Sequence, residues 1–86
     1  MDLEHLKVGD LITVITRTSL YIGELVEKND RVIRFSKGTV LMRNFKGDYS
    51  QLKGHVEMPI SDSVHISKVY PSNEALWNVY YKYKWI

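Results

Sequence analysis

The chain has 86 residues, with 12 lysines and arginines against 10 aspartates and glutamates, which gives a formal net charge of +2. A chain of this length has room for one domain with a small core, so we expect residues 1–86 to form a single domain. So weak a positive charge does not by itself indicate a nucleic-acid-binding protein. The chain has no cysteine, which excludes disulfides, a thiol nucleophile and a cysteine zinc site.

The sequence also bears on location. No segment contains the ~18 to 20 apolar residues of a membrane-spanning helix. The N-terminal segment carries acidic residues and no apolar stretch of the kind found in signal peptides. We therefore expect a cytoplasmic protein that does not associate with membranes.

The first eight residues, Met1 to Val8, are predicted to form a short helix or turn, with Asp2 as its cap and Leu3 and Leu6 on one face. Such a short helix is not stable alone, so it must pack against the rest of the domain. Gly9 and Asp10 would end it.

Residues 11–35 show the clearest strand pattern in the chain. Apolar and β-branched residues alternate with period two over residues 11–17 and again over 20–27, which predicts two strands. A polar trio at 28–30 predicts a turn, and residues 31–35 form a third strand.

Two features of this region predict its shape. Asn29 and Asp30 tolerate left-handed backbone and bond their own main chain, as turn residues do. Gly23 lies within the second strand, where a residue without a Cβ favours a bulge or the close crossing of another backbone. We therefore expect these strands to curl.

The remaining β structure is shorter. Residues 39–42 form either a short strand or the bent continuation of the previous one, and the polar segment 43–54 is predicted to be a long hairpin loop. Residues 55–60 form a fourth strand, which Pro59 places at an edge of the sheet. Residues 64–70 alternate as the last strand.

The C-terminal segment is predicted to be a helix that begins near Ser72 or Asn73, either of which can cap it. The residues that share one face of this helix are Leu76, Val79, Tyr80 and Tyr83, with Trp77, Tyr81 and Trp85 beside them.

The pattern Val-x-x-Arg-x-Ser-x-Tyr-Ile-Gly-Glu-Leu over residues 14–25, followed by the turn residue Asp30 and an alternating strand, resembles the first motif of the Sm-like family. Other SH3-like barrels share this skeleton. The resemblance implies an all-β fold: a small, five-stranded, strongly bent barrel of Sm-like or SH3-like type, with short N- and C-terminal helices. Val32 and Arg34 stand where the family has a base-stacking residue and an Asn, and its second Arg-Gly motif is absent, so uridine-specific RNA recognition does not carry over.

Nothing in the sequence indicates an enzyme. His5, His55 and His65 have no partners at metal-ligand spacing, so we predict no metal site and no cofactor. No nucleophile-elbow pattern surrounds a serine, and no glycine-rich phosphate loop precedes a helix. We expect no catalytic residues and no small-molecule substrate.

The middle of the chain is locally basic. Between residues 31 and 53, six basic residues face Asp48 alone, and two aromatic residues lie among them. Lysine contacts to phosphates, combined with aromatic stacking on bases, are how small barrels hold single strands, although a solvated loop can have the same composition. The residues predicted to contact RNA or DNA are Arg31, Arg34, Arg43, Phe45, Lys46, Tyr49 and Lys53. If the strands bring Arg31 and Arg34 opposite the basic loop, one continuous patch results.

The aromatic tail has two interpretations. It can cover the barrel as part of the core, or it can form an interface with a second copy of the chain or with another protein. For the interface, the residues are Trp77, Tyr80, Tyr81, Tyr83 and Trp85. This gives a second function hypothesis: a protein-interaction or assembly subunit that forms a homo-oligomer through barrel edges and its tail.

Overall fold

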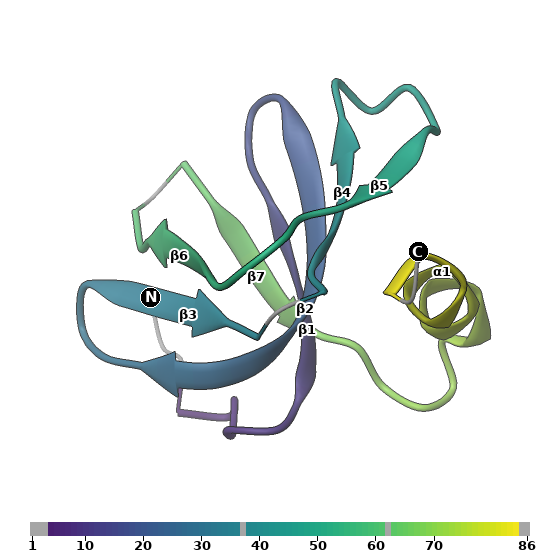
Figure 1. Cartoon of the computed structure of the whole chain (residues 1–86). Helices are drawn as coiled ribbons and strands as arrows, with labels where there is room; N and C mark the ends of the chain where they lie inside the picture. The colour runs from purple at the N-terminus through teal and green to yellow at the C-terminus, as the bar shows by residue number, and fades with distance from the viewer. Residues whose placement is uncertain (1–3, 37, 62, 85–86) are drawn as a thin grey trace.

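A computed structural model describes residues 4–36, 38–61 and 63–84 and shows one antiparallel β-structure followed by a C-terminal helix (Figure 1). Within these ranges there are seven strands and one helix: β1 (Leu11–Ile15), β2 (Ser19–Lys28), β3 (Val32–Phe35), β4 (Val40–Arg43), β5 (Tyr49–Gln51), β6 (Val56–Pro59), β7 (His65–Lys68) and α1 (Glu74–Lys84). The helix is neither long enough nor apolar enough to cross a membrane.

The long strand β2 connects two parts of the sheet. Its first half pairs with β1 on one side and with β4 on the other, and its second half pairs with β3. The register shifts between Leu25 and Glu27, which marks a bulge, and a bulge bends the strand that carries it. The curl predicted from the sequence is present in β2, which bends so that its two halves pair with different strands.

The described residues form seven strands and not the predicted five, because a break separates β3 from β4 and another separates β5 from β6. Both β3 and β4 follow β2, while β6 pairs with β3 and β5 pairs with β4. Gly38 and Gly54 lie in the two breaks, and both have positive φ, at 90° and 81°, which ends regular strand geometry. In the described residues no ladder joins β5 or β6 to β7, so the pairing path is open between β6 and β7.

Three further expectations can be compared with the structure. The segment 43–54 is not one continuous loop, because Tyr49–Gln51 forms β5 against β4. Residues 4 and 5 form a turn rather than a helix, and the rest of the predicted N-terminal helix falls partly on residues 1–3, outside the described residues. Pro59 lies in an edge strand, as predicted, since among the described strands β6 pairs only with β3.

The inner face of the curled sheet holds one apolar core. Its fully buried members are Leu6, Ile12, Val14, Leu25, Ile33 and Phe35, with Val64 and Ile66 closing it and Val56, Met58 and Ile60 packed at its edge. Leu6 lies in the N-terminal segment, so this segment packs on the sheet as expected although it forms a turn.

A second core lies on the outer face, between the sheet and α1. Leu11, Ile22, Val40 and Val69 from the sheet side pack with Tyr80, which is 2% exposed. The helix begins as predicted, because the Asn73 side-chain oxygen accepts a hydrogen bond from the Leu76 N–H at 3.4 Å. The helical face predicted from the sequence is thus the one that packs against the sheet.

Gly23 provides a test of the packing inside the bend. A Cβ at this position would lie 2.8 Å from the Thr39 hydroxyl oxygen and 2.9 Å from Cδ1 of Phe35, which is fully buried. We expect Gly23→Ala to lower the free energy of unfolding by about 1–3 kcal/mol, as overpacking does. Urea unfolding measures this. Ser50→Ala, an exposed change in β5, is the control and should stay within about 0.5 kcal/mol of the wild type; an equal effect of the two changes would contradict the close approach.

Candidate nucleic-acid interface

The basic residues predicted from the sequence lie in two separate places. Arg31 precedes β3 and Arg34 lies within it, whereas Arg43, Phe45 and Lys46 belong to the β4–β5 hairpin. The β3 region and the β4–β5 hairpin project from different sides of the molecule (Figure 1). β3 pairs with β6 and with the second half of β2, and not with the hairpin. The predicted continuous patch therefore does not form.

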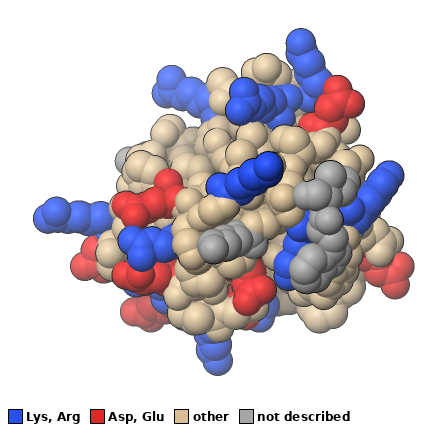
Figure 2. Space-filling model, viewed as in Figure 1, with Lys and Arg blue, Asp and Glu red and all other residues tan. Residues whose placement is uncertain are grey.

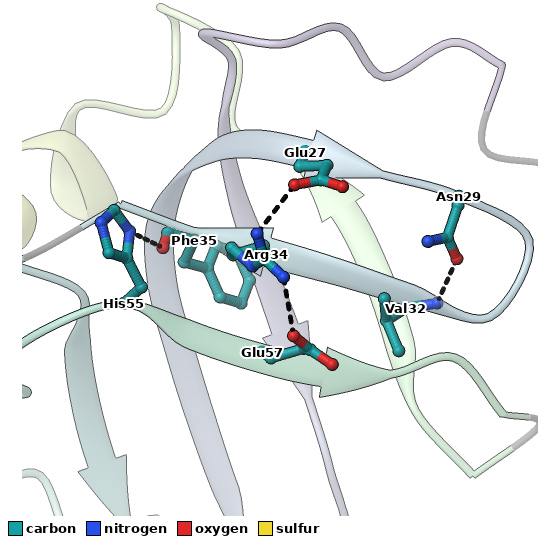
Figure 3. Close-up of polar contacts among 7 residues, drawn as sticks. All are labelled: Glu27, Asn29, Val32, Arg34, Phe35, His55 and Glu57. Atoms are coloured by element: carbon teal, nitrogen blue, oxygen red, sulfur yellow. Dashed lines mark hydrogen bonds and ion pairs between the residues drawn. The ribbon is translucent and has the colours of Figure 1, made fainter.

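Arg34 is held between two carboxylates from neighbouring strands (Figure 3). Its guanidinium donates to Glu27 in β2 at 2.8 Å and to Glu57 in β6 at 3.0 Å. The hydrogen bond to Glu57, with the charges of both carboxylates, raises the pKa of Arg34. Two acidic partners compensate its charge, so Arg34 orders the β2–β3–β6 ladder and is a weak candidate for phosphate binding.

The turn before β3 is built by Asn29, as its residue type predicted. The Asn29 side-chain oxygen accepts a hydrogen bond from the backbone N–H of Arg31 at 2.8 Å. It accepts a second one from the backbone N–H of Val32 at 3.0 Å (Figure 3). Val32 is half-buried. Val32 thus offers a half-buried aliphatic side chain at this strand, and Arg34 offers a guanidinium that is already ion-paired.

The tip of the β4–β5 hairpin is a strained turn. Asn44 and Phe45 both have a φ of 54°, and the Lys46 N–H donates to the Arg43 carbonyl at 3.2 Å. Two successive left-handed residues closed by this bond are the pattern of a type I′ turn, which usually places glycine where Phe45 lies. A bulky aromatic residue is rare in left-handed backbone, and Phe45 is also 48% exposed. The turn therefore presents a large apolar ring to solvent at a conformational cost.

A further cation, Arg17, joins this tip although the sequence analysis did not select it. Arg17 lies in the turn between β1 and β2, and Ser19 pairs with Arg43, so the two hairpin tips are neighbours. Lys and Arg side chains gather over these tips at the upper edge of the molecule (Figure 2). Among the described residues, no acidic side chain forms an ion pair with Arg17, Arg43 or Lys46. We call Arg17, Arg43, Phe45 and Lys46 the basic tip.

The other predicted residues have different surroundings. Tyr49 is half-buried, and its ring lies 5.3 Å from that of Tyr83, so it supports α1. Lys53 is exposed in the connection between β5 and β6, outside the tip. In the tail, Tyr80 is buried in the outer core and Trp77 and Tyr83 pack against that core, which leaves little of them for a partner.

The exposed aromatic of the tail is Tyr81, which is 53% exposed and stacks on Trp77 with 5.6 Å between ring centroids. Trp85 lies outside the described residues. Between residues 74 and 84 the tail is thus mainly core, with one exposed ring, that of Tyr81.

Within residues 4–36, 38–61 and 63–84 no group of three or more histidine and acidic side chains is placed to hold a metal ion. Comparisons with protein-family models, with curated proteins and with solved structures find no match to this chain.

The strain at Phe45 can be measured by comparing two substitutions that both remove the ring. Phe45→Gly relieves the left-handed conformation, whereas Phe45→Ala keeps its cost, so we expect the glycine variant to be the more stable of the two by about 1 kcal/mol. Urea unfolding of the two variants measures the difference. Equal stabilities would show that the turn is relaxed at this position.

Proposed function

We propose that this protein is a non-enzymatic nucleic-acid-binding module that contacts phosphates through Arg17, Arg43 and Lys46 and stacks a base on Phe45. The observation that carries the proposal is the exposed Phe45 ring, held in left-handed backbone between cations that have no ion-pair partner among the described residues. Conformational strain of this kind is found mainly at functional sites. In proteins that bind single strands, cations contact the phosphates of the backbone and an exposed aromatic ring stacks on a base.

The arrangement of strands supports a fold of Sm-like or SH3-like type for this module. β2 bends, the two interrupted paths β3–β4 and β5–β6 follow it as a meander, and β7 returns to pair with β1. A small barrel of this kind would present its hairpin tips on rigid strands. In this proposal RNA and DNA are both ligands, since phosphates and base faces are common to them.

The salt dependence of binding tests the proposed function. The double variant Arg43→Gln, Lys46→Gln removes two phosphate contacts, so the slope of log K against log salt concentration should become less steep by about 1.4 for a single strand. Fluorescence anisotropy with a labelled mixed-sequence oligonucleotide measures the slope.

Arg31→Gln is the matched control, because Arg31 is an exposed arginine in the other basic region. Its slope should equal that of the wild type if the basic tip is the binding site. Absence of binding by the wild-type protein at low salt, or equal losses in both variants, would contradict the proposal.

A second candidate function, a self-associating assembly subunit, is favoured by a specific observation. The outer edges of β6 and β7 have no strand partner in the described residues, and unpaired edges are templates for another chain. The exposed Tyr81 ring adds an apolar contact.

Self-association can be tested with a point variant. Deletion of the whole tail would uncover the outer core, since Tyr80 is buried there. We expect Tyr81→Ser to lower the mass measured by light scattering over a concentration series, with Tyr70→Ser, also an exposed tyrosine, as control. A monomer mass for the wild type at every concentration would remove this candidate.

A further inference from the structure

A row of side chains crosses the sheet next to the basic tip. In the registers of four ladders, His65 lies opposite Ile15, Ile15 opposite Leu20, Leu20 opposite Met42 and Met42 opposite Tyr49. Residues directly opposite each other in antiparallel strands have their side chains on the same face of the sheet. The five residues therefore form one row, which we call the end row. It runs about 19 Å across β7, β1, β2, β4 and β5, since neighbouring strands lie about 4.8 Å apart.

The end row lies on the outer face of the sheet, at the edge of the part that α1 covers: Tyr49, at one end of the row, packs against Tyr83 of α1, and Leu20 packs against the outer core. On this same face, the buried Thr13 lies two residues before Ile15 in β1, and the buried Ile22 lies two residues after Leu20 in β2. Ile22 belongs to the outer core beneath the helix. At the row itself burial falls: Ile15 is 41% exposed, His65 is exposed, and Leu20 and Met42 are half-buried. The row thus continues the outer core to the edge of the sheet, and its exposed members are Ile15 and His65.

This row is continuous with the basic tip. Met42 and Ile15 are close in sequence to Arg43 and Arg17, and the Met42 sulfur accepts a hydrogen bond from the Gly47 N–H at 3.2 Å, which ties the row to the turn that presents Phe45. Arg43 follows Met42 directly in β4, so its side chain lies on the opposite face of the sheet, whereas Arg17 lies in the turn that follows β1. Phosphates held at this end of the sheet would bring bases within reach of the row.

From this juxtaposition we propose that the end row is the base-contacting surface of the protein and that its ligand is a single-stranded nucleic acid. The inference rests on the proposed function and names its substrate class. The row offers side chains along one face of the sheet to the flat faces of bases, and these faces are free in a single strand but stacked inside a duplex. Imidazole and aliphatic side chains accept any base, so binding should show little dependence on sequence.

The inference predicts which residue controls affinity. Ile15 is the most exposed aliphatic residue of the row, so it can be changed without opening the core. Ile15→Tyr offers a ring on which a base can stack, and we expect it to bind a 12-nucleotide single strand at least about fivefold more tightly than the wild type, with Ile15→Ser correspondingly weaker.

Val8→Tyr is the matched control, because Val8 is an exposed aliphatic residue near the other end of β1. Anisotropy titrations of each variant with the single strand and with the same sequence as a duplex, at one fixed salt concentration, make the comparison. The expected result is a gain for Ile15→Tyr on the single strand alone and no change for Val8→Tyr.

Three other outcomes would overturn parts of the argument. Equal affinity for single strand and duplex, with both Ile15 variants unchanged, would remove the end row as a base-contacting surface while leaving the phosphate-binding tip in place. An equal gain in Val8→Tyr would show that any added surface ring binds the oligonucleotide, which also removes the specific role of the row. No binding by the wild type would remove the row and the proposed function together.

Discussion

The contact between Gly23 and Phe35 is the constraint on which the fold depends. β2 must pass close enough to Phe35 and Thr39 that no side chain fits between them, and only glycine permits this. The approach lets the first half of β2 pair with β1 and β4 while the second half pairs with β3. The inner core closes over Phe35 as a result, because β3 folds back over the same strand that supports the outer face.

One consequence of this bend is that the strands at the centre of the sheet supply two cores. Along β1, Ile12 and Val14 point into the inner core while Leu11, on the opposite face of the strand, belongs to the outer core with Ile22 of β2. A strand buried on both faces needs a second layer, and α1 provides it with Tyr80 and its neighbours. The aromatic tail is therefore explained mainly by the need to cover the outer face. The described part of α1 packs against the end row at Tyr49 and leaves Ile15 and His65 exposed.

The sequence predicted well what depends on local pattern. Period-two alternation located β1, β2 and β3, and Asn29 and Asn73 formed the turn and the helix cap that their side chains favour. The number of strands was wrong because Gly38 and Gly54 interrupt two strand paths, and single glycines in polar segments do not distinguish a break from a loop.

The candidate site was harder to predict because it depends on contacts between segments distant in sequence. Arg34 looked like a phosphate ligand until Glu57, 23 residues away, was seen to bond it. No sequence pattern marked Arg17 as a candidate binding residue, because its position beside Arg43 follows from the register of β2 with β4. Counting charges along the chain cannot separate a cation with two carboxylate partners from one with none.

The difference between a paired and an unpaired cation determines which cations are suited to bind a phosphate. A cation that is already paired with two carboxylates loses those bonds when it binds a phosphate, so the exchange yields little free energy. Arg17, Arg43 and Lys46 carry no such cost within the described residues. The strained turn at Phe45 persists because β4 is fixed on one side by β2 and on the other by β5, so the ladders hold a conformation that the turn alone would not adopt. Stability thus comes from the interior of the sheet, and the tip can be specialised for binding without endangering the fold.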